Sequence, residues 1–297
     1  MIFLYEFAVG GSEDIPKDIL CEGKAMFDTL LDQFLEFEEV ITLIDERFFG
    51  EYKGRENLYI ETMKGGDDLT KKIENMLEVS DAALIIAPED DGVLYNLTKL
   101  VENSGVLNLG SSSEAIRIAG DKYLTYESIK NSVKTPRTMP LKKYLIKRRD
   151  GCGGEHFIYD ENYIIQEFVE GDPYSVSLIV GKKIHPISLN KQYINTNGYC
   201  GGETNINHPL KDEIFKECIK AVKKIDGLNG YVGVDVIVGD EIYIIEINPR
   251  ITTSIYGIKT NPSLAKLLVD NAYGKELEFK VGKGKRFIKK DGEMLFK

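Results

Sequence analysis

The first third of the chain alternates between short apolar runs and longer amphipathic stretches. Four runs have the length and the branched and aromatic content typical of buried β-strands, at residues 1–7, 39–48, 57–64 and 81–88. Three stretches carry apolar residues at helical spacing, at residues 18–38, 67–80 and 92–105. This alternation predicts a small parallel sheet with helices on its faces.

Ligands of such a sheet bind beyond the carboxyl ends of its strands. Residues 6–12 follow the first predicted strand, and the segment APEDDG, residues 87–92, follows the fourth. Both segments read equally well as ordinary polar loops. Because of their position after predicted strands, the two segments are our first candidates for a ligand-binding edge.

The pattern changes near residue 115. Serines that can cap a helix are followed by prolines typical of an extended segment, and hairpin and helix patterns then fill the rest of the chain. We expect a glycine-rich loop at residues 195–210 and a closing hairpin, rather than a nucleic-acid-binding arm, in the basic tail at 280–292. The predicted division is an N-terminal α/β domain (1–115), a small lobe with a glycine-rich loop (116–165) and a C-terminal lobe (166–297).

Two carboxylates and an amide interrupt an otherwise apolar hairpin at residues 231–254, YVGVDVIVGDEIYIIEINPRITTS. These are Asp235, Glu246 and Asn248. An ionised carboxylate taken out of water costs several kcal/mol unless it is compensated. A solvated face with scattered acids is one explanation. A hard divalent cation is the better one, since it takes oxygen ligands and keeps some waters.

The hairpin pattern also predicts a register. A two-residue turn at Gly239–Asp240 would place Asp235 opposite Ile244. Because side chains alternate along a strand, Ile244, Glu246 and Asn248 would then share the face of Asp235. We therefore expect one core face and one face with oxygen ligands for one or two ions, magnesium or alternatively manganese.

Composition narrows the class of protein. With 297 residues, 42% of them hydrophobic and 29% charged, the chain can form two or three lobes with full cores. No apolar run approaches the ~18 residues of a membrane span, and the N-terminus lacks the features of a signal peptide, so we expect a cytoplasmic protein. The net charge of −10 argues against a general nucleic-acid binder.

The cysteines and histidines do not suggest a metal site of their own. The four cysteines have no CxxC spacing, and the three histidines are scattered. Zinc is therefore not expected. A catalytic Cys–His pair stays open, but no spacing favours it.

Three further segments have features of a nucleotide site. Lys122 lies in GDK, and Lys147 ends a predicted strand before the glycine-rich DGCGG. Glycine-rich turns leave backbone N–H groups free for a phosphate, and a lysine adds charge. The apolar segment IIQEFVEG, residues 164–171, suits the packing of an aromatic base. Taken singly, these segments are equally typical of a helix start, a hairpin turn and a strand.

Taken in order, GDK, LIKRRDGCGG, IIQEFVEG, GVDVIV and IIEINPR resemble the ATP-grasp superfamily over essentially the whole chain. The resemblance implies an ATP-grasp fold, α/β and α+β in class, preceded by a Rossmann-like α/β domain. It also implies that ATP is held between two lobes and activates a carboxylate as an acyl phosphate, which an amine attacks.

The resemblance implies roles for individual positions. It assigns the nucleotide to Lys122, Lys147, Gly151, Gly153, Gly154, Gln166, Glu167, Phe168, Val169 and Asp172. It assigns metal binding to Asp235, Glu246 and Asn248, and it assigns catalysis to Arg250 together with Lys147. Many relatives have a ribose-binding glutamate where this chain has Pro173, so Asp172 or Glu170 is expected to substitute.

A narrower resemblance lies in EFAVGGSE, APEDDGVL and EINPRITTSIYGI. These segments resemble the archaeal ATP-grasp ligases that join tyramine to L-glutamate on the route to methanofuran. The implied partners are small molecules, with no nucleic acid and no membrane. The following residues are candidates for substrate contacts: Glu6 or Glu89 for the tyramine ammonium, Lys191 or Arg250 for the α-carboxylate, and Tyr193 and Tyr199 for an aromatic ring.

Other functions stay open at this point. The catalytic core does not encode the substrate, so a ligase for another amino acid and amine is an alternative. An ATP-grasp kinase of a hydroxyl group and a non-catalytic nucleotide-binding module are two more. The complete set of lysines, acids and Arg250 argues against the last, because a binding module has no need for it. The sequence does not predict an oligomeric state.

Overall fold

The computed structural model describes residues 1–11, 15–150, 152–154, 156–196 and 198–297. Five parallel strands form the N-terminal sheet in the order β3-β2-β1-β4-β5. Their bounds are β1 (Ile2–Glu6), β2 (Val40–Asp45), β3 (Leu58–Met63), β4 (Ala82–Ile86) and β5 (Leu107–Asn108). The predicted parallel α/β sheet is confirmed, and the two-residue strand β5 was not predicted.

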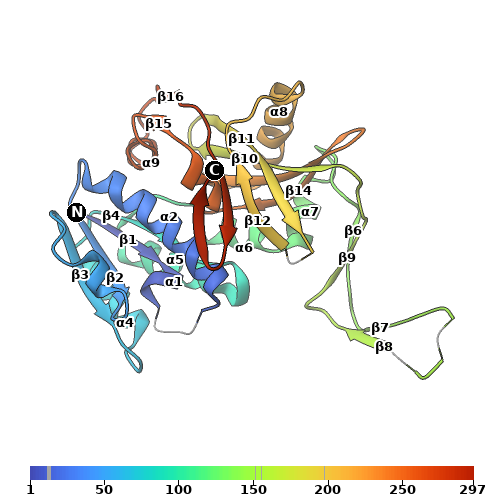
Figure 1. The fold of residues 1–297 in the computed structure, drawn as a ribbon, viewed down its shortest axis with the longest axis horizontal. Helices are drawn as coiled ribbons and strands as arrows, with labels where there is room; N and C mark the ends of the chain where they lie inside the picture. Colours follow the sequence, from blue (N-terminus) through green and yellow to red (C-terminus); the bar gives the residue numbers. More distant parts are fainter. Residues whose placement is uncertain (12–14, 151, 155, 197) are drawn as a thin grey trace.

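Helices cover both faces of this sheet (Figure 1). Helix α2 (Lys17–Leu35) packs on one face, while α4 (Leu69–Glu78) and α5 (Val93–Ser104) pack on the other. Two four-residue helices, α1 (Phe7–Gly10) and α3 (Phe49–Tyr52), follow β1 and β2. The inner strands β1, β2 and β4 are buried from both sides, which explains their apolar sequences, whereas the edge strand β3 is only partly buried.

Two short helices lead away from the sheet. Helix α6 (Ser113–Gly120) begins at Ser112, whose hydroxyl accepts a hydrogen bond from Ala115 N at 3.2 Å. Helix α7 (Lys122–Ile129) begins at Asp121, whose carboxylate accepts from the N–H groups of Tyr123 and Leu124. The predicted capping by serine is thus confirmed.

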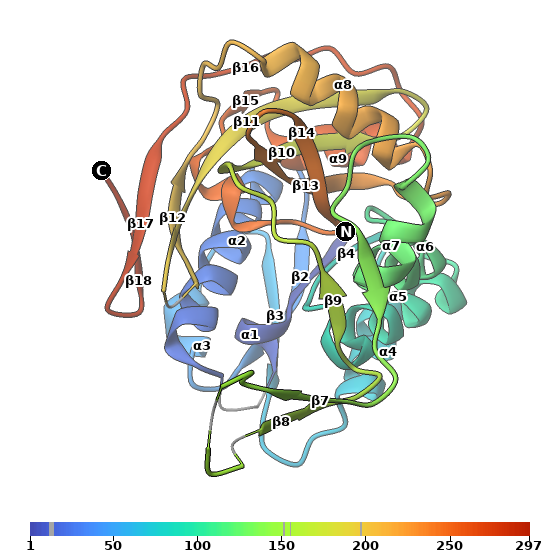
Figure 2. The ribbon, with the colours of Figure 1, turned by 90° about the vertical axis from the view of Figure 1, so that its right-hand side faces the viewer.

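Two thin ribbons form an arm that projects from the body (Figures 1 and 2). Strands β6 (Thr138–Pro140) and β9 (Ile164–Gln166) pair as its stem, and β7 (Tyr144–Lys147) and β8 (His156–Tyr159) pair as its tip. All four residues of β7 are exposed. The arm contributes no residue to any of the hydrophobic cores of the described chain.

A seven-stranded antiparallel sheet forms the C-terminal part, in the order β14-β13-β10-β11-β12-β17-β18. Its strands are β10 (Asp172–Val180), β11 (Ile184–Asn195), β12 (Gly198–Glu203), β13 (Gly230–Val238), β14 (Ile242–Asn248), β17 (Arg286–Lys290) and β18 (Glu293–Phe296). Helix α8 (Lys211–Val222) covers one face of the sheet, and α9 (Leu264–Ala272) packs on the other beside α2. A two-stranded ribbon, β15 (Thr260–Asn261) with β16 (Lys280–Val281), precedes the last hairpin.

The register predicted for the acidic hairpin is wrong. The turn between β13 and β14 has three residues, so Val238 pairs with Ile242 and Val236 with Ile244. Ile244 is therefore buried in the core and does not share the face of Asp235. A β-bulge then restores the alternation, and Asp235 pairs directly with Glu246.

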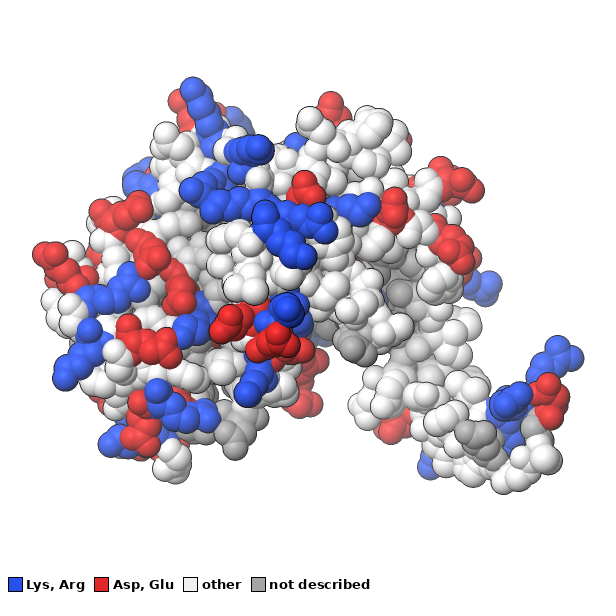
Figure 3. Space-filling model, viewed as in Figure 1, with Lys and Arg blue, Asp and Glu red and all other residues white. Residues whose placement is uncertain are grey.

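Residues 195–210 are only partly a loop. Strand β12 lies within them and pairs with both β11 and β17. A Cβ at Gly201, which has φ +141°, would clash with the Phe287 backbone, so this strand needs its glycines. The predicted hairpin in the basic tail is confirmed as β17–β18. Figure 3 shows Lys and Arg gathered over this C-terminal region and mixed with acidic side chains elsewhere on the same face.

Candidate active site

A cavity of about 760 Å³ lies between the N-terminal sheet and the C-terminal sheet. On one side its wall is the carboxyl edge of β1 and β4, where Glu6 pairs with Ile86. On the other side are strands β10, β11, β13 and β14. The order β3-β2-β1-β4-β5 reverses between β1 and β4, and ligands of open α/β sheets bind at such a point.

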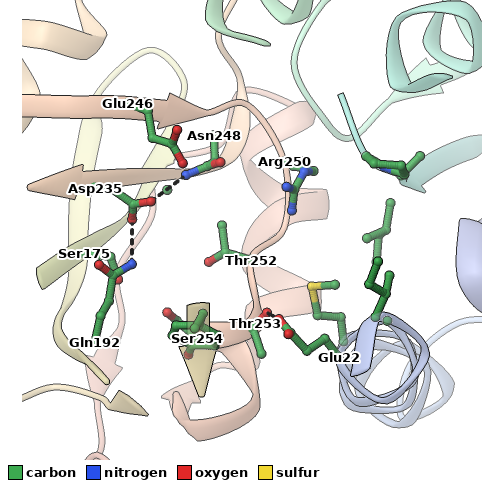
Figure 4. Close-up of a pocket in the computed structure, with 18 of the residues that line it drawn as sticks. Glu22, Ser175, Gln192, Asp235, Glu246, Asn248, Arg250, Thr252, Thr253 and Ser254 are labelled. Carbon is green, nitrogen blue, oxygen red and sulfur yellow. Dashed lines mark hydrogen bonds between the residues drawn. The ribbon is translucent and has the colours of Figure 1, made fainter. Parts of the chain in front are cut away.

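Asp235 and Glu246 lie side by side on adjacent strands in this cavity (Figure 4). Asp235 Oδ1 accepts a hydrogen bond from Gln192 Nε2 at 3.0 Å, and Oδ2 accepts a weak one from Asn248 Nδ2 at 3.4 Å. Glu246 Oε2 forms an ion pair with Lys122 Nζ at 2.9 Å. The structure therefore brings all three predicted metal ligands together with one predicted phosphate ligand, Lys122.

Charge and burial affect the two carboxyl groups in opposite ways. Burial raises the pKa of Asp235, and the neighbouring Glu246 carboxylate raises that pKa further. Burial also disfavours the Glu246 anion, but Lys122 outweighs it and the pKa of Glu246 falls. When both carboxyl groups are ionised, the pair carries two negative charges against the single positive charge of Lys122. A bound cation would neutralise the excess negative charge and favour the ionised form of Asp235.

The donor set fits a hard divalent cation. Two carboxylates and an amide oxygen are available in one partly buried place, and such oxygen ligands suit Mg²⁺ or Mn²⁺. Among the residues that the structure describes, no cluster holds three or more His, Cys, Asp or Glu side chains suited to a metal. The third protein ligand here would be the side chain of Asn248.

Arg250 enters the same cavity two residues after Asn248. Its Nε donates a hydrogen bond to Glu89 Oε2 at 2.9 Å, and its Nη1 donates to the Ile251 carbonyl. Glu89 thus holds the guanidinium in place, and Gly120 leaves room for the side chain of Glu89. The predicted alternative, in which Glu89 receives an ammonium, is less suitable because this carboxylate already has a cation.

Glu6 lines the cavity from the end of β1 and is only 4% exposed. Its Oε2 accepts a hydrogen bond from Val9 N at 2.8 Å and so caps α1. Burial raises the pKa of Glu6 to about 7, against the lowering effects of the Val9 and Ala8 N–H groups and of Arg250.

Several cavity residues were not predicted from the sequence. Gln192 holds Asp235, and Glu22 of α2 accepts hydrogen bonds from Thr253 Oγ1 and Lys289 Nζ, both at 2.7 Å. The strand pattern could have indicated Gln192, because side chains alternate along β11 and Gln192 therefore lies on the opposite face from Lys191 and Tyr193. That opposite face is the one that lines the cavity. The interaction of Glu22 with Lys289 joins positions that no local pattern connects.

Other predicted site residues lie away from the cavity wall. Lys147, Gly153 and Gly154 lie on the arm, and Gly151 is outside the described residues. Lys191 and Tyr193 face away from the cavity. Lys191 Nζ lies over the Tyr174 ring, and the Tyr193 hydroxyl donates a hydrogen bond to Glu203. Tyr199, by contrast, lines the cavity.

The segment predicted to bind adenine connects the arm to the C-terminal sheet. Gln166 Nε2 donates to Thr138 Oγ1 at 3.0 Å, and Glu167 accepts from Arg137 N at 3.2 Å. Phe168 is 84% exposed, Val169 follows it, and Asp172 begins β10. The next residue, Pro173, lines the cavity, so this segment ends at its rim.

Comparison with known proteins identifies the family. The tyramine–L-glutamate ligase of Methanocaldococcus fervens is 61% identical over 290 residues, which are 97% of this chain and 99% of that protein. The profile of the ATP-grasp domain matches residues 119–254. The chain belongs to the ATP-grasp family. The profile of the pre ATP-grasp 3 domain matches residues 39–116 of this ATP-grasp protein.

Further relatives agree with this. The tyramine–L-glutamate ligase of Methanocaldococcus jannaschii is 60% identical over 291 residues, or 97% of this chain and 94% of that protein. The crystal structure of a putative ATP-grasp superfamily protein from Archaeoglobus fulgidus superposes on this chain with a TM-score of 0.75 and 36% sequence identity. The alignment covers 97% of this chain and 91% of the Archaeoglobus chain. N5-carboxyaminoimidazole synthetase from Staphylococcus aureus, at 13% identity and a TM-score of 0.67 over 97% of this chain and 81% of its own, shares the fold. In the described part of this ATP-grasp chain, no helix is both long and apolar enough to span a bilayer.

Proposed function

We propose that this chain is an ATP-dependent carboxylate–amine ligase that joins tyramine to the γ-carboxylate of L-glutamate. The products are γ-glutamyltyramine, ADP and phosphate. One observation carries this proposal: two tyramine–L-glutamate ligases are 61% and 60% identical to the chain, and each alignment covers 97% of it. An alignment of that extent includes both walls of the cavity.

The chemistry needs an activated carboxylate. A carboxylate does not react with an amine at neutral pH, but an acyl phosphate does, because phosphate is a good leaving group. Transfer of the terminal phosphoryl group of ATP to the γ-carboxylate supplies this activation. Such a transfer depends on positioning and charge neutralisation more than on a protein base.

The acidic hairpin would neutralise that charge. Asp235, Glu246 and Asn248 would hold one or two Mg²⁺ ions, which neutralise phosphate charge when they are bound. Lys122 would then be free to leave Glu246 and contact phosphate oxygens. Arg250, which Glu89 holds at 2.9 Å, would stabilise the acyl phosphate and the transition state that forms it.

The arm and its connection would hold the nucleotide. Lys147 and the glycines 151, 153 and 154 would cover the phosphates, and Gln166, Glu167, Phe168 and Val169 would bind adenine. Asp172 or Glu170 would contact the ribose in the absence of the usual glutamate. We retain the division into residues 1–115, 116–165 and 166–297, in which the middle lobe is the cover.

The cavity suits two small substrates that both carry an ammonium. Its described lining has carboxylates at Glu6, Glu22 and Asp90 besides the acidic pair, and Arg250 as its basic side chain. Arg250 remains the candidate for a carboxylate of glutamate, and Tyr199 is the candidate for contact with an aromatic ring. Lys191 and Tyr193 remain predictions without a place at the cavity. ATP and glutamate are cytoplasmic metabolites, so we expect the enzyme there, in methanofuran biosynthesis.

The test is a reaction with ATP, Mg²⁺ and L-glutamate, with and without tyramine. ADP and a γ-glutamyltyramine product, identified by mass spectrometry, should appear together only when tyramine is present. Another amine or amino acid that reacts much faster would overturn the substrate assignment. A phosphorylated alcohol, or no ADP under any condition, would contradict a ligase.

A further inference from the structure

Glu6 lines the cavity without a basic partner among the described residues. The ion pairs among the described residues include Glu22 with Lys289, Glu89 with Arg250 and Glu246 with Lys122, but none includes Glu6. Glu6 is also the most buried of these acids, at 4% exposure. A buried carboxylate supported only by backbone N–H groups is costly to keep ionised.

The fold nevertheless makes room for this carboxylate. A Cβ at Gly23 of α2 would lie 2.5 Å from Glu6 Oε1, so a larger residue there would displace it. Capping of α1 alone would not require an acid, since serine or asparagine caps a helix as well. The side chain is therefore placed for something that enters the cavity.

The charged groups around Glu6 suit the arrival of a cation. Arg250 is the charged side chain that acts on it electrostatically, and Glu22 and Asp90 line the cavity on neighbouring elements. Asp45, at the end of β2, is paired with Arg47 and lies outside the cavity lining. Glu6 thus stands near the residue proposed to hold the acyl phosphate, which is where an attacking nitrogen must be.

We propose that Glu6 binds the ammonium of the incoming amine and accepts its proton. This inference rests on the proposed function and deepens it. Of the two carboxylates predicted for the ammonium, Glu6 and Glu89, this leaves Glu6, because Arg250 holds Glu89. A base with a pKa near 7 is matched to neutral pH, where it is partly ionised and can still accept a proton.

The ammonium nitrogen gives one proton to the Glu6 carboxylate and becomes a neutral amine. The nitrogen lone pair forms the C–N bond to the γ-carbonyl carbon, and the C–O bond to phosphate breaks with its electron pair on the phosphate. The departing phosphate takes a second proton from nitrogen, which leaves a neutral amide. Glu6 then returns its proton to solvent.

Hydroxylamine separates this step from the rest of the reaction. It is uncharged at neutral pH, so it can trap an acyl phosphate as the hydroxamate without a protein base. In Glu6→Gln, we expect the rate of γ-glutamyltyramine formation to fall about 100-fold or more, while hydroxamate formation from ATP and glutamate stays near that of the wild type. Glutamine keeps the side-chain carbonyl that caps α1, and the matched control is Asp45→Asn, which removes a carboxylate of similar burial outside the cavity.

Each outcome decides one question. A tyramine rate in Glu6→Gln close to that of the wild type would overturn the role of Glu6. An equal loss of both reactions would also overturn it, because Glu6 would then act on the acyl phosphate or on the fold. If the wild type forms no hydroxamate with glutamate, the proposed function fails instead. The same amine-specific loss in Asp45→Asn would mean that the effect is not particular to Glu6.

Discussion

At the scale of residues, the site depends on carboxylates that the protein keeps partly or fully out of water. Lys122 pairs with Glu246 and two side-chain amides donate to Asp235, whereas Glu6 accepts from backbone N–H groups only. Such groups lower stability unless a ligand or an ion compensates them. Replacing these carboxylates by amides should therefore lower activity while it preserves or raises the stability of the fold.

Substitution of the acidic pair tests the first of these sites. We expect Asp235→Asn and Glu246→Gln each to lower the ligase rate about 100-fold or more, because each removes a charge that a metal needs. The fold should survive, since both changes remove repulsion between adjacent carboxylates. The measurements are the steady-state rate and the thermal midpoint. Asp240→Asn, an exposed acid in the turn of the same hairpin, is the control; a near-normal rate in either site variant would refute the metal assignment.

The stability of Glu6→Gln should depend on pH in a defined way. The folded protein holds the Glu6 proton up to a pKa of about 7, whereas the unfolded chain loses it near 4.5. The stability linked to this proton is therefore present in full below about pH 4.5 and is lost as pH rises to about 7. The difference in the free energy of unfolding between Glu6→Gln and the wild type should therefore shift by up to ~3 kcal/mol in favour of the variant between pH 4.5 and pH 8. Urea unfolding at both pH values measures this, and a pH-independent difference would speak against it.

At the scale of elements, periodicity predicted most of the structure but not its long-range pairing. The strands and helices of the first domain were predicted correctly because the inner strands β1 and β4 are buried on both sides and the helices bury one apolar face. Strand β12 was missed because its sequence, GYCGGE, has no apolar alternation and its partner β17 lies over 80 residues later. The hairpin register failed because a three-residue turn and a β-bulge cannot be read from apolar spacing. The bulge nonetheless restores the pairing of acids on which the site depends.

The arm offers a test at this scale. Lys147 is exposed at its tip, so Lys147→Ala should change the free energy of unfolding by less than about 0.5 kcal/mol. If Lys147 contacts phosphate, ATP should bind on the order of tenfold more weakly, which isothermal titration calorimetry measures. The control is Lys143→Ala on the same arm. Equal ATP affinity in the wild type and Lys147→Ala would remove Lys147 from the site.

At the scale of the whole molecule, one core joins the two sheets. It contains Leu4 of β1, Leu30 of α2, Tyr231 of β13 and Leu268 of α9. The cavity lies across the same junction, so the geometry of the site depends on both halves together. The sequence could not predict this, because the contacts join positions more than 200 residues apart.

This shared core predicts cooperative unfolding. We expect one urea transition, with the same midpoint by far-ultraviolet circular dichroism and by tyrosine fluorescence. The arm should add no transition of its own, because it contributes no residue to a core. Two separated transitions would mean that the halves fold independently.

Activation of the γ-carboxylate of glutamate as an acyl phosphate in this cavity can be tested by following the oxygen atoms of that carboxylate. The most direct measurement uses L-glutamate labelled with ¹⁸O in its γ-carboxylate, together with ATP, Mg²⁺ and tyramine. If the acyl phosphate forms, one labelled oxygen appears in the phosphate released with each γ-glutamyltyramine, as mass spectrometry of the phosphate would show. Unlabelled phosphate alongside a labelled amide product, or release of AMP in place of ADP, would contradict it.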